Sequence, residues 1–116
     1  MAATVLIVDS EAGIRQLLRV ALAEAGYEPK LASSHEEARR ICLDGGIDLV
    51  LADVGLHMNG HDLARTVAEQ SPHLRVLLMA GWDEGCEGCP FSPRCYTINK
   101  PFRLERLLAA VAQALA

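Results

Sequence analysis

The sequence predicts an α/β fold in which helices cover both faces of a five-stranded parallel sheet. Short apolar runs of strand length alternate with longer segments whose apolar residues recur every three or four positions. This alternation is typical of three-layer, doubly wound parallel sheets. The chain has 116 residues, 51% of them hydrophobic, which is enough for a single domain over residues 1–116. In such folds the functional side chains gather where the strands end.

Five segments have the length and composition of β-strands. They are residues 4–8, 27–32, 47–53, 74–80 and 96–99. Three of them (TVLIV, IDLVLAD and LRVLLMA) are nearly continuous apolar runs, which predicts strands buried on both faces. The second segment, YEPKLA, contains Pro29, and a residue without a backbone donor suits an edge strand.

Helices are predicted after the first two strands. The first helix has apolar residues on one face, and these are Ile14, Leu17, Leu18, Ala21, Leu22 and Ala25. Gly26 ends this helix. Ser34 and Glu37 form a capping box that opens the second helix, and Cys42 lies on its apolar face as a small core residue.

Two further helices are predicted in the C-terminal half. One begins at Gly60 and ends before Pro72. The last helix carries Leu104, Leu107, Leu108, Val111 and Leu115 at helical spacing. A fourth helix is due within residues 81–95, but glycines, prolines and three cysteines replace the helical spacing there. A Cys-rich loop with at most one helical turn is therefore predicted in its place.

Composition and charge argue against several classes of function. The net charge is −4 at pH 7 and no basic cluster is present, which disfavours nucleic acid or an anionic membrane as a direct partner. The first residues lack the features of a signal peptide, and no run approaches the roughly 18 apolar residues of a membrane-spanning helix. We therefore expect a soluble cytoplasmic protein, in which clustered cysteines indicate metal or redox chemistry more often than structural disulfides.

Charged side chains follow three predicted strands at one edge of the sheet. Asp9 comes after the first strand, Asp53 ends the third, and Lys100 follows the last. Two carboxylates in one crevice suit Mg²⁺, which keeps several waters and takes only one or two protein carboxylates. Lys100 offers a compact cation for a phosphoryl oxygen. Each residue alone is more often a cap or a surface residue, but together they predict attack by an aspartate on phosphorus, giving an aspartyl phosphate.

Three motifs carry a resemblance to a known family. LIVDSEAGIRQLLRVAL, IDLVLADVGLHMNGHDLAR and NKPF resemble the receiver domain of bacterial two-component response regulators, over nearly the whole chain. The resemblance implies a flavodoxin-like fold and phosphorylation of Asp53 by a partner histidine kinase. It also implies Mg²⁺ held by Asp9, Asp53 and the backbone carbonyl of Gly55, with Lys100 in contact with the phosphoryl group.

Several positions depart from this family pattern. Ser10 stands where the resemblance implies a second carboxylate, so the affinity for Mg²⁺ should fall. Glu11 could reach in, although its place at a helix start suits the helix dipole more simply. Ala80 replaces a Ser or Thr whose hydroxyl would hydrogen-bond the phosphoryl group, a bond of roughly 1.5–3 kcal/mol. Thr97 replaces an aromatic residue. We therefore expect a recognisable phosphoacceptor with a partly degenerate metal site and switch.

Three cysteines, Cys86, Cys89 and Cys95, have the spacing C-x2-C-x5-C. The first gap lets two thiolates reach one metal, but three ligands are one short of a closed tetrahedral site. Three alternatives stay open: thiols without a cofactor, a Zn²⁺ or iron–sulfur centre, and a reversible disulfide. A coordination centre would order a loop that lacks an apolar stripe.

The leading functional hypothesis is a stand-alone receiver in phosphorelay signal transduction, which is an interaction module and not an enzyme. Its partners would be a histidine kinase or phosphotransfer protein and another signalling protein as output. The alternative is a phosphorylation-independent metal- or redox-sensing module that uses Cys86, Cys89 and Cys95. The first strand is followed neither by Asp-x-Asp, as in haloacid-dehalogenase-type phosphatases, nor by a glycine-rich phosphate loop. The oligomeric state stays open.

Overall fold

The computed structural model describes residues 2–54, 74–80, 95–99 and 102–116. The strands in these ranges are β1 (Thr4–Val8), β2 (Glu28–Ala32), β3 (Leu49–Val54), β4 (Arg75–Ala80) and β5 (Cys95–Asn99). The helices are α1 (Ala12–Glu24), α2 (His35–Asp44) and α4 (Leu104–Leu115). All of these elements were predicted from the sequence, and the strand boundaries differ from the predicted ones by two residues at most.

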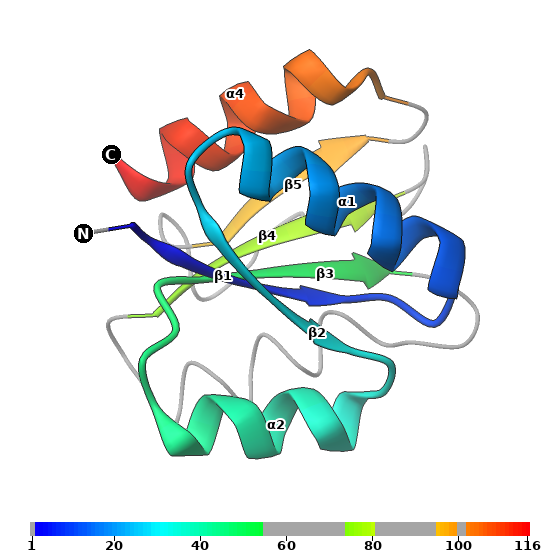
Figure 1. Cartoon of the computed structure of the whole chain (residues 1–116), viewed down its shortest axis with the longest axis vertical. Helices are drawn as coiled ribbons and strands as arrows, with labels where there is room; N and C mark the ends of the chain where they lie inside the picture. Colours follow the sequence, from blue (N-terminus) through cyan, green and yellow to red (C-terminus); the bar gives the residue numbers. More distant parts are fainter. Residues whose placement is uncertain (1, 55–73, 81–94, 100–101) are drawn as a thin grey trace.

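The strands form a single parallel sheet in the order β2-β1-β3-β4-β5. The N-terminal strand β1 therefore lies inside the sheet, between β2 and β3, while β2 lies at an edge. Pro29 pairs with Val5 of β1 on one side, and none of the described strands lies on its other side, as its missing donor predicted. Because all strands run in the same direction, their carboxyl ends share one edge of the sheet (Figure 1).

Helices cover both faces of the sheet, which confirms the predicted three-layer architecture. Figure 1 shows α1 and α4 on one face and α2 on the other. Successive strand residues point to opposite faces, so Val5 and Ile7 pack on the α1–α4 side while Leu6 and Val8 pack on the α2 side. These four side chains are at most 1% exposed. Burial on both faces explains why β1 reads as an unbroken apolar run.

The helix ends follow from local sequence. Gly26 has a φ of 96°, a conformation that favours glycine, just after α1 ends. The hydroxyl of Ser34 accepts a hydrogen bond from the backbone N–H of Glu37 at 3.2 Å, which confirms the predicted cap of α2. The carboxylate of Glu37 accepts from the N–H of Ser33 at 2.8 Å, so the reciprocal bond lies one residue before the N-cap.

Two predicted elements lie outside the described residues. These are the helix expected from Gly60 to Pro72 and the Cys-rich loop expected within residues 81–95, apart from Cys95, which opens β5. Both stay predictions. Among the helices that the structure describes, none is long and apolar enough to cross a membrane.

Candidate functional site

Two aspartates lie at the carboxyl ends of neighbouring strands. Val8 of β1 is the direct partner of Ala52 of β3, and the next residue in each strand direction is an aspartate, Asp9 and Asp53. Neighbouring strands lie roughly 5 Å apart, so this register brings the two residues to the same place at the sheet edge. On its other side, Asp53 is paired with Met79 of β4.

Both aspartates are buried. Asp9 is 2% exposed and Asp53 is 8% exposed, and they are the buried charged residues among those that the structure describes. Burial of an ionised carboxylate costs free energy unless hydrogen bonds or a cation compensate for the lost hydration. Two buried carboxylates at one strand edge are therefore typical of a functional site rather than of a stabilising core.

The turn that carries Asp9 is held by several hydrogen bonds. The backbone N–H of Asp9 donates to the carbonyl of Ala32 in β2 at 3.2 Å. One carboxylate oxygen of Asp9, Oδ1, accepts from the backbone N–H of Glu11 at 2.9 Å. The guanidinium of Arg15 donates to the backbone carbonyl of Asp9 at 2.6 Å. The main chain of Asp9 is thus fixed on both sides of its Cα atom.

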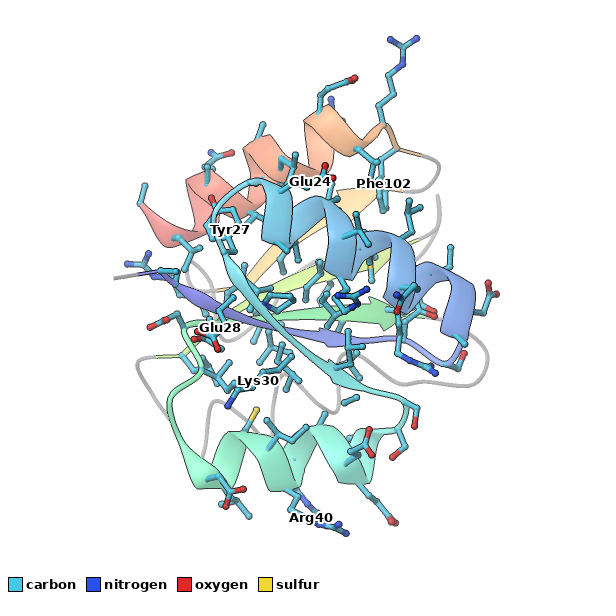
Figure 2. All side chains as sticks on the ribbon, viewed as in Figure 1. Glu24, Tyr27, Glu28, Lys30, Arg40 and Phe102 are labelled. Carbon is cyan, nitrogen blue, oxygen red and sulfur yellow. The ribbon has the colours of Figure 1, made fainter. Side chains whose placement is uncertain are left out.

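A pocket of about 540 Å³ adjoins this turn on the α1–α4 side of the sheet. Its described lining residues come from the Asp9 turn, α1, β4 and the start of α4, and they are Asp9, Glu11, Ile14, Leu17, Leu18, Met79, Phe102 and Leu104. Figure 2 shows Phe102 just before α4, which is where the chain returns from β5. By strand alternation Asp53 points to the same side as Leu51, which packs against α1 and α4. Asp9 therefore lines an apolar pocket at the sheet edge, and Asp53 points to the same side of the sheet.

The donor set of the site fits Mg²⁺. Two carboxylates are as many as Mg²⁺ usually takes from a protein, and the remaining positions are filled by water or a phosphoryl oxygen. Glu11 lines the same pocket but is exposed at the N-cap of α1. Among the described residues, no three His, Cys, Asp or Glu side chains are grouped so that they could hold a metal ion. Glu11 therefore does not complete a three-carboxylate site with the two aspartates, and Ser10 is exposed.

The other residues predicted for the site are only partly covered by the structure. Gly55, Lys100, Cys86 and Cys89 lie outside the described residues. The backbones of three further residues, Ala80, Thr97 and Cys95, belong to β4 and β5.

The backbone pairing brings the ends of β4 and β5 to the edge that holds the aspartates. Ala80 pairs with Val54 on one side and with Asn99 on the other. The residue after Asn99 in the sequence is Lys100. Strands β3, β4 and β5 therefore end at the same edge of the sheet.

Cys42 is unrelated to this site. It is 5% exposed and belongs to the core cluster between the sheet and α2, which confirms its prediction as a small core residue. Burial raises the pKa of its thiol to about 11, so the neutral form prevails at physiological pH.

The metal or redox hypothesis for Cys86, Cys89 and Cys95 stays a prediction from the sequence. Elemental analysis of natively purified protein would test whether these cysteines bind a metal.

A family model described as "Response regulator receiver domain" matches residues 5–112. The chain belongs to the response regulator receiver family. The match includes the Asp9 turn, the end of β3 with Asp53, and Lys100, so the receiver resemblance drawn from the sequence motifs is confirmed for nearly the whole chain.

Curated relatives and solved structures agree with this membership. The chain is 33% identical to the DNA-binding transcriptional regulator NtrC of Rhizobium meliloti, over 98% of this chain and 24% of that protein. It is also 33% identical to the PhoB protein of Pseudomonas aeruginosa, over 97% of this chain and 51% of that protein. The structure of the chemotaxis protein CheY4 of Vibrio cholerae superposes with a TM-score of 0.87 at 28% identity, over 99% of this receiver and all of that chain.

The extent of these matches differs between relatives. The receiver spans about a quarter of the NtrC proteins that it matches and about half of PhoB. CheY4, in contrast, is covered completely. Receivers thus occur among its relatives both as parts of longer regulators and as chains of this size.

Arg15 and Phe102 were not predicted as site residues from the sequence. Arg15 is a charged residue in the first helix, between the apolar positions Ile14 and Leu18, and only the fold brings its guanidinium back to the Asp9 carbonyl. Phe102 directly follows the Lys-Pro motif and lines the pocket beside Asp9. Its place in the motif NKPF is the sequence feature that could have identified Phe102 as a site residue.

Proposed function

We propose that this receiver accepts a phosphoryl group on Asp53 from a histidine kinase or phosphotransfer protein, with Mg²⁺ bound by Asp9, Asp53 and the carbonyl of Gly55. The observation that carries the proposal is the pair of buried aspartates at adjacent strand ends. Lys100 would contact the phosphoryl group. We propose residues 1–116 as the domain that takes part in the transfer, and its stand-alone action stays a sequence-based prediction.

The chemistry follows from the carboxylate of Asp53. A carboxylate oxygen attacks the phosphorus of a phosphohistidine, a new O–P bond forms, the N–P bond breaks, and the imidazole nitrogen leaves with the electron pair. When bound, Mg²⁺ would neutralise charge on the phosphoryl oxygens during this displacement. The role of Asp9 is to supply a fixed negative charge beside Asp53, which favours a bound cation. Lys100, the residue after Asn99 in the sequence, would supply a second positive charge to the phosphoryl group.

The site that we propose is partly degenerate. Ser10 brings no charge, and the exposed position of Glu11 gives no support for a replacement ligand. Ala80 has no hydroxyl to bond the phosphoryl group, and Thr97 is no aromatic switch residue. A two-state element shifts only by the difference in interaction between its states, so the loss of these contacts should leave a weak switch after phosphorylation.

A surface for the partner lies beside the proposed site. Leu17 and Val20 of α1 are 50% and 41% exposed, and Leu17 lines the pocket that also contains Asp9. Leu104, at the start of α4, is 37% exposed. Exposed apolar side chains close together mark interaction surfaces more often than they mark the solvated surface of a monomer. These residues support docking of a kinase or phosphotransfer protein next to Asp53.

Intact-mass spectrometry after incubation with acetyl phosphate and Mg²⁺ tests the proposal. The wild-type chain should gain about 80 Da, the mass of one phosphoryl group, and EDTA should prevent the gain. Asp53→Asn should show no gain, whereas the matched control Asp44→Asn, an exposed residue at the end of α2, should behave like the wild type. An unmodified wild-type chain, or an equal gain in Asp53→Asn, would contradict the proposal.

A further inference from the structure

The guanidinium of Arg15 binds the main chain of the turn that carries Asp9. It donates to the backbone carbonyl of Asp9 at 2.6 Å, six positions back in the sequence. The backbone N–H of Arg15 also donates to the carbonyl of Glu11 at 3.0 Å, which is the first helical bond of α1. The side chain and main chain of Arg15 therefore bind both ends of the turn from Asp9 to Glu11. Arg15 itself is only partly exposed.

The orientation of the Asp9 carboxylate depends on this turn. Its Oδ1 atom accepts from the N–H of Glu11 at 2.9 Å, so a shift of Glu11 relative to Asp9 would also shift the carboxylate. The neighbouring residue Ser10 has no charge with which to bind a cation. Of the Mg²⁺ ligands proposed above, Asp9 and Asp53 are the charged ones, so the position of Asp9 matters more than it would in a site with three carboxylates.

We propose that Arg15 is a positioning residue, which holds the Asp9 carboxylate in the geometry required for Mg²⁺ binding through its bond to the Asp9 carbonyl. This inference rests on the proposed function, since it assumes that Asp9 and Asp53 bind the metal. Arg15 acts through the main chain of Asp9 and does not contact the metal or the phosphoryl group.

Position and charge predict opposite effects for Arg15. A guanidinium near the metal repels a cation, so its removal would tighten Mg²⁺ binding if charge were its main effect. If Arg15 instead orients Asp9, its removal weakens binding, because partners that orient metal ligands typically change affinity by about 10- to 100-fold. The sign of the change therefore separates the two roles.

The experiment is a Mg²⁺ titration of the full chain, followed by amide chemical shifts in ¹⁵N–¹H NMR spectra. Three variants are compared with the wild type: Arg15→Met, Arg15→Lys and the control Arg19→Met. Arg19 lies one turn further along α1, and its guanidinium donates to the side-chain oxygen of Gln16 in the same helix at 3.2 Å. Arg15→Met keeps an apolar stem but has no donor, while Arg15→Lys keeps the charge and a donor. Thermal unfolding of each variant verifies that it is folded.

We expect Arg15→Met to raise the Kd for Mg²⁺ by about tenfold, Arg15→Lys to stay within about threefold of the wild type, and Arg19→Met to leave it unchanged. An unchanged or lower Kd in Arg15→Met would overturn the inference. So would an equal rise in Arg19→Met, since a general loss of helix stability would then explain the result.

The metal-free spectra separate this inference from the proposed function. If the wild type shows no saturable Mg²⁺ shifts, the proposed metal site is wrong, but the role of Arg15 is still tested by the amide of Glu11. In Arg15→Met that amide should shift and exchange faster with solvent, because its bond to Asp9 Oδ1 is loosened, while it should be unchanged in Arg19→Met. A Glu11 amide unaffected by Arg15→Met would show that Arg15 does not position Asp9.

Discussion

Val8 in β1 and Ala52 in β3 are paired across neighbouring parallel strands, and each is followed by a buried aspartate. The register that buries apolar side chains on both faces of the sheet thereby also brings Asp9 next to Asp53. A slip of one residue in either strand would turn its apolar side chains to the wrong faces. The packing of the core therefore fixes the geometry of the proposed phosphoacceptor site.

Asp9→Asn should weaken Mg²⁺ binding by about tenfold or more, because it removes one of the two buried charges of the site. The matched change Glu11→Gln should alter the Kd by less than about twofold, since Glu11 is exposed and its backbone N–H is kept. Isothermal titration calorimetry with MgCl₂ measures both. Equal losses in the two variants would mean that the Glu11 carboxylate is a ligand after all.

Leu17→Glu should slow phosphotransfer from a histidine kinase without changing phosphorylation by acetyl phosphate. Leu17 is 50% exposed beside the proposed site, and a charge there would oppose docking of an apolar surface. We expect a reduction of about tenfold or more in the transfer rate. The assay uses a kinase that phosphorylates the wild-type chain in a profile of the kinases from the source organism.

The control for this prediction is Leu43→Glu. Leu43 is 62% exposed, but it lies near the end of α2, on the face of the sheet opposite to α1. Its transfer rate should equal that of the wild type. If Leu43→Glu slowed transfer as strongly as Leu17→Glu, the docking surface would not be the one on α1.

Arg75→Met should lower the free energy of unfolding by roughly 1–2 kcal/mol. The guanidinium of Arg75, at the start of β4, donates to the carbonyls of Ala114 and Ala116 at 2.7 and 2.8 Å. These carbonyls lie at the end of α4, where a positive charge also interacts favourably with the helix dipole. Urea denaturation of Arg75→Met, and of Arg40→Met on the exposed side of α2, measures the difference. A loss as large in Arg40→Met would point to a general charge effect.

Cys42 should make the stability of the fold pH-dependent above pH 9. Burial raises the pKa of its thiol from 9.0 to about 11 in the folded state. The neutral thiol therefore stabilises the fold fully below pH 9, and this contribution is lost as the pH rises from 9 to about 11. At pH 10 the loss should be roughly 1 kcal/mol relative to Cys42→Ala, compared by urea denaturation at pH 8 and pH 10.

The same burial should protect Cys42 from alkylation. Iodoacetamide at pH 8 should label Cys42 only after unfolding, because the thiolate is the reactive form and the side chain is 5% exposed. Peptide mapping by mass spectrometry distinguishes Cys42 from the other cysteines. Rapid labelling in the native state would contradict the packing described for α2.

Much of the fold was predictable because local patterns agreed with the global one. Unbroken apolar runs identified β1, β3 and β4, Pro29 indicated the edge position of β2, and Ser34 with Glu37 marked the start of α2. The strand-end aspartates were predicted as site residues for the same reason, since parallel strands carry functional groups at their carboxyl ends.

The contacts of Arg15 and Arg75 could not be predicted in this way. Each guanidinium reaches a backbone carbonyl, and a carbonyl is present at every residue, so no residue type in the sequence marks the partner. The pocket beside Asp9 was also not foreseen, because its lining is contributed by α1, β4 and the start of α4, which are far apart along the chain.

The sequence by itself determined the alternation of strands and helices, the apolar faces of the core and the residue types available for phosphoryl chemistry. Local spacing and propensity are sufficient for these, since each depends on neighbours a few positions away. The tertiary structure alone decided the strand order, the pairing of Val8 with Ala52 that brings Asp9 beside Asp53, and the hydrogen bond from Arg15 to the Asp9 carbonyl. These depend on which distant segments pack together, and that choice is made by burial of the whole core.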